Sequence, residues 1–462
     1  MGLNKMMPPA GRWRAPMRAL VRALALACAA AGAALPAAAL DLSQAWRLAV
    51  EQDATIRASR AAAEATRERL PQARAQFYPN VSASSSRTRN LLETTGPNAL
   101  GESATTKDRY TSSNDALTLR QPLLRKQLTA QYRQAQALVA DGEAVLERDL
   151  QSLVIRVTQA YFETLLAEEQ LRLVALQKTT YATQVDAARK GFNAGAGTRT
   201  DIDEAQARLD LTVAQELEAR QNVDLARRQL EVLINQPVRE PVMAVNVALL
   251  PLVPPVPDSV EAWTAQAEAA SPEIASARAQ IDVARADVDR ASAGHWPTLD
   301  AIAQISRSGS DNPTRVGTRY DQKQIGLQLT VPIFQGGFVN SQVRETLALV
   351  ERAENRLDEV RRDLGVRVHR EFRGVSEGVL RVRALEQAVR STEQLAVSSR
   401  RSFEAGARTR LDILNAEQQL GTARRDLAQA RFAYLVARVR LKALSGELRA
   451  QNIDEINSWL VR

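Results

Sequence analysis

Few residues in this chain of 462 have the chemistry of nucleophiles, acid–base groups or ligands. A Gly-x-Ser-x-Gly pattern occupies Gly374–Gly378, with Ser376 at the position of a hydrolase nucleophile. That chemistry requires a sharp turn between a strand and a helix. The residues on both sides of Ser376 have helical spacing instead, which argues against a hydrolase. The same glycines match the Gly-x-x-x-Gly pattern of packed membrane helices, but only weakly, because they do not lie in an apolar run.

Metal and cofactor chemistry have equally little support. The only histidines are His295 and His369, and neither belongs to a metal-binding motif. His369 stands in a run with helical spacing, where we expect a solvated or packing role, and we also expect His295 to be structural. No glycine-rich phosphate or dinucleotide loop occurs. We therefore predict a protein that is not an enzyme and that needs no cofactor or metal.

Residues 1–39 are typical of a secretory signal peptide. Basic residues precede an apolar run that ends before Pro36, and Ala37–Ala39 fit a cleavage site after Ala39. Cys28, the only cysteine, ends an imperfect lipoprotein box, so lipid attachment there is an open alternative. The segment holds five basic and no acidic residues, so the mature net charge is 8 − 5 = +3. We therefore expect no nucleic-acid partner.

Two runs without proline predict very long helices. No proline occurs from Leu123 to Gln236 or from Ile333 to the end, and proline costs roughly 3 kcal/mol inside a helix. Within the first run, apolar residues step by three and four, as a coiled coil requires. The runs are interrupted at Gly191–Thr200 and Gly406–Arg410, each after a helix of about 70 residues, or on the order of 100 Å. Such helices must pack lengthwise against one another.

Two other stretches alternate between polar and apolar residues. Leu299–Ser306 and Gln324–Ile333 predict a β-hairpin with arms of about 10 residues around a polar turn, Gly309–Thr318. Weaker alternation at Tyr78–Arg89 and Tyr110–Gln121 predicts a second hairpin around a polar loop. Four strands are too few to close a barrel. A membrane-spanning barrel of such strands would therefore need several chains.

The two halves of the chain are similar to each other. Arg189–Ile202 aligns without gaps with Arg400–Ile413, and Tyr78-Pro79 matches Trp296-Pro297. We therefore predict an internal duplication rather than a solenoid. The expected divisions are a first repeat at 40–236, a proline-rich linker at 237–258, a second repeat at 259–446 and a C-terminal tail at 447–462.

With this organisation, the sequence resembles the TolC family of outer-membrane efflux and secretion channels, the outer membrane factors. The resemblance covers nearly the whole mature chain. Its motifs are Thr158–Phe162, Gln121–Leu124, Gly191–Ile202, Val331–Gly337 and, most specifically, Phe403–Asn415.

The resemblance implies a mostly α-helical homotrimer with a small β part. Four strands per chain would contribute to one transmembrane β-barrel in the outer membrane of a Gram-negative bacterium, in contact with its lipid. The helices would continue into the periplasm as a long antiparallel coiled-coil α-barrel. The helix–strand junctions would lie at Pro79, Pro122, Pro297 and Pro332.

The resemblance also implies where the channel closes. The helix breaks would form the periplasmic tip, with turn and adaptor-docking residues Phe192, Gly195, Thr198, Arg199, Gly406, Thr409 and Arg410. The gate or constriction would comprise Asp201, Glu204, Phe403, Arg408, Asp412 and Asn415. Phe403 replaces a gate tyrosine of the family, and Asn415 replaces the aspartate of an acidic ring. We expect Glu204, the counterpart of Asn415 in the first repeat, to carry that charge.

As a function, the resemblance implies a passive exit duct that works with a periplasmic adaptor, or membrane fusion protein, and an inner-membrane transporter. Leu42–Ala49 and Leu70–Arg74 look more like members that serve type I secretion through an ABC exporter, with a toxin or protease as cargo. The outer-membrane component of a proton-driven (RND-type) drug efflux pump is one alternative. A periplasmic coiled-coil adaptor protein is an alternative of another class.

Overall fold

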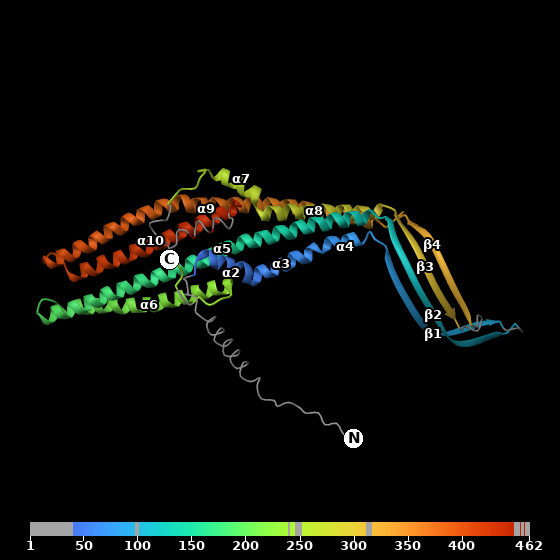
Figure 1. The fold of residues 1–462 in the computed structure, drawn as a ribbon, viewed down its shortest axis with the longest axis horizontal. Helices are drawn as coiled ribbons and strands as arrows, with labels where there is room; N and C mark the ends of the chain where they lie inside the picture. Colours follow the sequence, from blue (N-terminus) through green and yellow to red (C-terminus); the bar gives the residue numbers. More distant parts are fainter. Residues whose placement is uncertain are drawn as a thin grey trace, which may run out of the picture.

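The computed structural model describes residues 40–97, 101–238, 241–244, 252–310 and 317–447, together with Ile453 and Asn457. The predicted signal peptide, Cys28 and most of the expected tail lie outside the described residues. The described chain is strongly elongated, with a β-sheet at one end and two helical hairpins at the other (Figure 1).

Two long helices form the axis of the molecule. Helix α5 (Lys126–Asn193) has 68 residues and α9 (Phe338–Glu404) has 67, which confirms the lengths predicted from the proline-free runs. Each folds back on a shorter helix, α6 (Arg199–Ile234) or α10 (Arg410–Leu444). At 1.5 Å per residue, each long helix extends about 100 Å.

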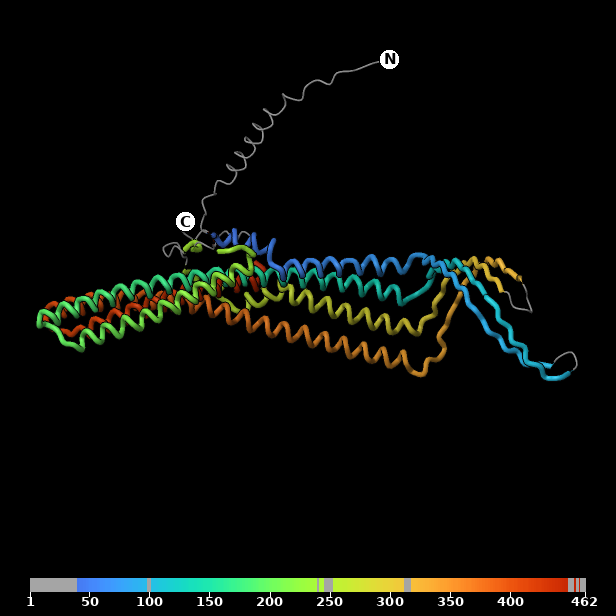
Figure 2. The backbone as a smooth tube through the Cα atoms, turned by 90° about the horizontal axis from the view of Figure 1, so that it is seen from below, coloured from blue at the N-terminus to red at the C-terminus, as the bar shows by residue number. Residues whose placement is uncertain are grey.

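Shorter helices precede each pair of strands. They are α2 (Leu42–Gln52), α3 (Ala54–Arg67) and α4 (Arg69–Ala75) before the first pair, and α7 (Val260–Ala270), α8 (Pro272–Ser292) and the 3-10 turn η2 (Ala293–His295) before the second. Towards the sheet, α3 and α4, α5, α8 and α9 lie side by side (Figure 2). Towards the hairpin tips, α10 packs against both α9 and α5, and α6 packs against α5. None of the helices in the described chain has both the length and the hydropathy needed to cross a membrane.

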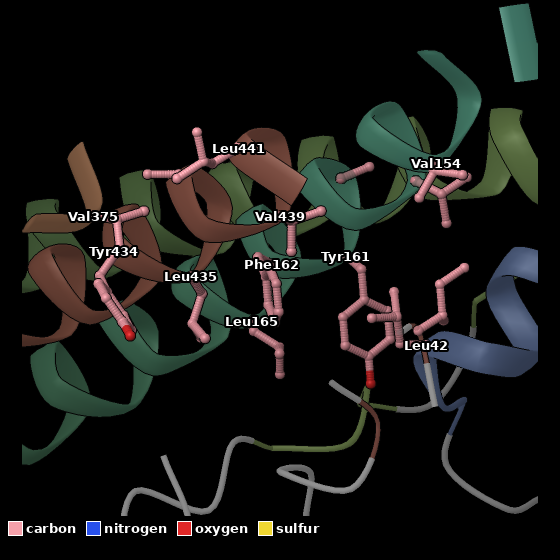
Figure 3. Close-up of a cluster of buried hydrophobic side chains, with 14 of the residues drawn as sticks. Leu42, Val154, Tyr161, Phe162, Leu165, Val375, Tyr434, Leu435, Val439 and Leu441 are labelled. Atoms are coloured by element: carbon pink, nitrogen blue, oxygen red, sulfur yellow. The ribbon is translucent and has the colours of Figure 1, made fainter. Parts of the chain in front are cut away.

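The largest buried cluster lies midway along the helices. It contains Leu42, Leu153, Tyr161, Phe162, Val375, Tyr434 and Leu435 (Figure 3). The Tyr161 hydroxyl lies within hydrogen-bond distance of the Leu40 and Met243 carbonyls, at 3.0 and 3.2 Å, and the Tyr434 hydroxyl lies 3.0 Å from the Val253 carbonyl. Burial raises the pKa of Tyr161, which keeps its hydroxyl a donor. The two tyrosines thereby tie the segments around the middle of the molecule to α5 and α10.

The pattern Gly374–Gly378 has a packing role. Both glycines lie inside α9, so the strand that a nucleophile elbow requires is replaced by helix. A Cβ at Gly374 would come within 3.0 Å of the Ala437 Cβ, and one at Gly378 within 3.2 Å of the Tyr434 ring. The glycines therefore allow α9 to approach α10 closely. No sequence pattern had indicated this contact between α9 and α10.

The four strands form one antiparallel sheet in the order β1-β2-β3-β4. They span β1 (Asn80–Pro97), β2 (Ser103–Leu124), β3 (Thr298–Ser310) and β4 (Thr318–Thr330). The predicted arms of about 10 residues in the second hairpin were slightly too short, because β3 and β4 have 13 residues each. The predicted arms of the first hairpin, Tyr78–Arg89 and Tyr110–Gln121, fell further short of β1 and β2, which have 18 and 22 residues. Residues expected to form its polar loop continue the ladder, because threonines pair across it, with the Thr95 and Thr105 hydroxyls 2.9 Å apart.

Prolines lie at or near the strand ends. Pro79 and Pro297 come directly before β1 and β3, and Pro332 lies two residues beyond β4. Pro122 instead lies inside β2, at the register shift between Pro122 and Leu124. A proline has no N–H to donate, so a strand accepts it at such an irregularity. The expectation that Pro122 marks the junction itself was therefore off by a few residues.

A buried carboxylate connects the base of the sheet to α5. Asp300 of β3 is 2% exposed and accepts hydrogen bonds from Arg120 Nε at 2.9 Å and Arg125 Nε at 2.8 Å. Arg120 belongs to β2, and Arg125 is the N-cap residue of α5. The cluster therefore fixes the position where strand changes to helix. Breaking a buried ion pair leaves an uncompensated charge, which is costly.

We predict that Asp300→Asn lowers the free energy of unfolding by about 2 kcal/mol, less than for a fully buried pair because half-exposed Arg120 can turn to water. The matched control is Asp321→Asn in the same hairpin, whose carboxylate pairs with Arg307 at 2.6 Å but is 60% exposed. Its expected loss is below about 0.5 kcal/mol. Urea unfolding in detergent, followed by tryptophan fluorescence, measures both. Equal losses would contradict the special role of Asp300.

Candidate functional site: the tips of the helical hairpins

Both hairpins turn through the same backbone motif. Gly195 after α5 and Gly406 after α9 each have φ of 74°, in the left-handed region that favours glycine. The next amide in each turn donates back to the end of the helix, from Ala196 to Gly191 at 2.9 Å and from Ala407 to Ser402 at 2.8 Å. The two glycines therefore end the long helices, as their positions in the sequence suggested.

The return helices begin with matching capping boxes. Thr198 caps α6, where its hydroxyl accepts from the Asp201 amide at 3.2 Å while its own amide donates to the Asp201 carboxylate at 2.8 Å. Thr409 and Asp412 repeat this at α10, with distances of 3.3 and 2.9 Å. Hydrogen bonds from the Thr409 amide and hydroxyl lower the pKa of Asp412. Both aspartates named as gate candidates are thus occupied in starting their own helices.

The two arginines after Gly406 differ in their contacts. Arg408 Nη1 donates to the Ser399 hydroxyl at 3.1 Å within the same hairpin. The Arg410 guanidinium lies 4.8 Å from the Phe403 ring centroid, a cation–π contact. A Cβ built at Gly191 would come 2.9 Å from Arg410 Nη2. Arg410 therefore reaches across to α5 of the other hairpin.

A further arginine links the hairpins one turn deeper. Arg208 of α6 donates to the Asn415 side-chain oxygen of α10 at 2.8 Å, and its other nitrogen donates to the Gln418 side chain. Its acceptors are neutral amides, so the link is a charge-assisted hydrogen bond. The sequence had not singled out Arg208 or Gln418. Their partners lie more than 200 residues away, and no motif marks such a pair.

A small apolar cluster lies near this link, between α5, α6 and α10. Tyr181 and Val185 of α5, Ala205 of α6 and Leu414 of α10 form one buried cluster.

Of the remaining candidates, Glu204 is half-buried, while Phe192 and Arg199 are exposed, and Arg199 lies 3.4 Å from Asp203. In the described chain, Asp201 and Arg408 form no ion pair with each other.

The contacts at the tip are non-covalent contacts between side chains and backbone groups of the helices. Its polar contacts are hydrogen bonds, ion pairs within single hairpins such as Arg199 with Asp203, and the cation–π contact of Arg410 with Phe403. Of the two histidines, His295 lies 3.1 Å from the Asn340 side chain near the sheet, and His369 lies exposed on α9. The described residues contain no cluster of three or more metal-binding side chains.

The fold defined by these hairpins and the four strands is that of outer-membrane channel proteins. The chain superposes on the Campylobacter jejuni CmeC outer membrane channel with a TM-score of 0.75, at 17% identity, over 91% of this chain and 90% of that chain. The outer membrane protein VceC of Vibrio cholerae gives a TM-score of 0.74, at 18% identity, over 88% and 96% of the two chains.

Sequence comparison assigns the family. The model of the outer membrane efflux protein family matches residues 18–236 and 263–447. The alkaline protease secretion protein AprF of Pseudomonas aeruginosa is 34% identical over 420 residues, which are 90% of this chain and 87% of AprF. The proteases secretion protein PrtF of Dickeya chrysanthemi is 30% identical over 426 residues, 92% of each chain.

The outer membrane protein TolC of Escherichia coli is 31% identical over 328 residues, 69% of this chain and 66% of TolC. The chain therefore belongs to the outer membrane efflux protein family. It is an outer-membrane channel protein of the Gram-negative type, which confirms the resemblance and removes the periplasmic adaptor from the alternatives.

We predict that Arg208→Gln loosens the contact between the hairpins, because it removes a link that contributes roughly 1 kcal/mol. Spin labels at exposed Ala207 and Gln419 report the distance between α6 and α10. In Arg208→Gln, we expect a broader distribution shifted to longer distances. Arg425→Gln is the matched control, because within the described residues Arg425 bonds only to Thr422 of its own helix. A distribution as narrow as that of the unmodified chain would contradict the proposed link.

Proposed function

We propose that three copies of this chain form one continuous exit duct through the outer membrane and periplasm. The sheet has two edge strands, β1 and β4, and in the described chain no strand pairs with their outer sides. Four strands cannot close on themselves, and open edges require partners within a membrane. Pairing β1 of one copy with β4 of the next satisfies both edges.

The helices support assembly in the same way. Leu211, Leu225 and Val232 of α6 are 65%, 58% and 77% exposed. They follow one another at spacings of 14 and 7 residues, which places them on one side of a coiled coil. A large apolar row of this kind is unfavourable in water. A helix of a neighbouring copy is the partner that covers it.

We propose that the duct serves type I protein secretion, with a protease as cargo. The observation that carries this proposal is the similarity to AprF and PrtF along nearly the full length of all three chains, since both are named for protease secretion. An inner-membrane ABC exporter supplies the energy, and a periplasmic adaptor docks at the turns around Gly195 and Gly406. In this arrangement Phe192, Arg199 and Arg410 lie where the adaptor makes contact.

The test is replacement of AprF in Pseudomonas aeruginosa. We expect the chain to restore alkaline protease in the culture medium of a strain without AprF, while an empty vector leaves the protease inside the cells. The parallel measurement is drug resistance in Escherichia coli without TolC. Restored resistance together with no secreted protease would favour the alternative of a proton-driven efflux pump and would overturn the secretion proposal.

We propose that Glu204 supplies the negative charge at the constriction. Three Glu204 carboxylates around a threefold axis attract cations into the pore. Asn415 has no charge to offer and is bonded to Arg208. In planar bilayers under a KCl gradient, Glu204→Gln is expected to reduce the reversal potential most of the way to zero. The control is the neighbouring Asp203→Asn, and an unchanged potential in Glu204→Gln would rule the assignment out.

A further inference from the structure

The two faces of the sheet have different compositions. The unbroken register places Ser82, Ser84 and Ser86 of β1 on the same face as Thr118 of β2 and Gln304 of β3. The only charged residues on this polar face, in the described strands, are Arg120 and Asp300 at the base and Asp108 near the tip. A face of small, neutral polar groups suits the water-filled interior of the duct.

The opposite face begins with an exposed apolar band at the helical end of the sheet. Ile325 and Leu327 of β4 are 87% and 70% exposed. The band consists of Val81, Leu117, Leu119, Ile305, Ile325, Leu327 and Leu329. Exposed aliphatic side chains in such a row fit the hydrocarbon of a bilayer.

Beyond this band, further from the helices, the same face becomes basic. We call this region the basic band, and it contains seven cationic residues: Arg87, Arg89, Lys107, Arg109, Arg307, Arg319 and Lys323. The acids on the same part of the face are Glu93, Asp115 and Asp321. Seven cations against three acids leave four positive charges in excess per chain, and three copies triple that excess.

Ion pairs occupy only part of the basic band. Arg87 pairs with Asp115 at 2.9 Å, Arg307 with Asp321 at 2.6 Å, and Lys107 with Glu93 at 2.6 Å. For the other four cations, Arg89, Arg109, Arg319 and Lys323, the described chain provides no ion pair. Arg89 lies on β1, Arg109 on β2, and Arg319 and Lys323 on β4. If β1 of one copy pairs with β4 of the next, Arg89, Arg319 and Lys323 gather at the joint between copies.

We propose that the basic band binds the phosphate groups of a bisphosphorylated glycolipid in the outer leaflet of the outer membrane. This inference rests on the proposed trimeric duct. The apolar band sets the depth of the sheet in the hydrocarbon, so the basic band lies at the level of the headgroups on the side away from the helices, outside the cell. Arginine binds phosphate with paired N–H groups. Several cations around one joint match a lipid that carries more than one phosphate.

The charge pattern favours a lipid over a cargo molecule. Cargo passes along the polar face, which faces the interior, whereas the basic band shares its face with the apolar band. A pocket at the boundary includes Leu117 and Ile305 together with Arg307 and Lys323. Asp115 and Asp321 also line this pocket and pair with Arg87 and Arg307, so Lys323 is the lining cation without an ion pair in the described chain. The pocket therefore offers apolar contact to an acyl chain next to a cation for a headgroup.

The test uses the full-length trimer in neutral detergent, titrated with bisphosphorylated lipid A and followed by native mass spectrometry. The variant is Arg89→Gln/Arg319→Gln/Lys323→Gln, which leaves the three ion pairs intact. We expect it to bind lipid A at least about tenfold more weakly than the unmodified trimer. The matched control is Arg57→Gln/Arg69→Gln/Arg381→Gln, which removes three exposed cations from helices and is expected to bind as tightly as the unmodified trimer.

A second measurement does not depend on the variants. For the unmodified trimer, we expect dephosphorylated lipid A to bind at least about tenfold more weakly, and NaCl raised from about 0.05 to about 0.5 M to weaken binding of the phosphorylated form. Equal binding of the two lipids would overturn the proposal. So would equal binding of phosphatidylglycerol, equal losses in both triple variants, or full affinity in the variant of the basic band.

Flotation separates this inference from the proposed duct. If the unmodified trimer floats with vesicles of phosphatidylcholine but prefers no phosphorylated lipid, only the lipid site is wrong. If the chain forms no trimer and does not float with any vesicle, the proposed duct itself fails.

Discussion

The length of α5 and α9 is the constraint on which the rest of the structure depends. A straight helix of nearly 70 residues cannot bury an apolar surface by folding onto itself, so each side of it needs a lengthwise partner. On the side of the sheet the partners are α3, α4 and α8, and on the side of the tips they are α6 and α10. The packing changes near the middle, where Tyr161 and Tyr434 hold the connecting segments.

The sheet continues from these helices, but its backbone hydrogen bonds follow a different pattern. In the interior of a helix each backbone group finds its partner within the same helix, whereas a sheet leaves the backbone groups of its two edge strands open. The buried carboxylate of Asp300, bonded to Arg120 and Arg125, fixes the place where strand changes to helix. A rotation of the strands at this point would exchange the polar and apolar faces, because side chains alternate along each strand. The cluster therefore orients the whole sheet as well as joining it to α5.

Local signals in the sequence were enough to predict the helices and their turns. Missing prolines predicted α5 and α9, and Gly195 and Gly406 marked where they end, because conformational preferences act within a few residues. Contacts between distant segments had no such signal. Arg208 meets Asn415 only because α6 and α10 lie close together, and Asp300 meets Arg125 only through strand register. Strand lengths were underestimated because threonine-rich polar strands look like loops when cross-strand pairing is not known.

At the tip, the two positions where we expected this chain to depart from the family pattern, Phe403 and Asn415, each contact an arginine. A tyrosine hydroxyl at position 403 would need a polar partner, but Phe403 presents only its ring, and Arg410 lies against it. A carboxylate at position 415 would hold Arg208 as an ion pair, whereas Asn415 holds it through a hydrogen bond to a neutral group. Both contacts hold an arginine without a carboxylate as the partner. With Asp201 and Asp412 occupied in capping α6 and α10, the polar connection between the hairpins near the tip rests on Arg208 and its neutral acceptors Asn415 and Gln418.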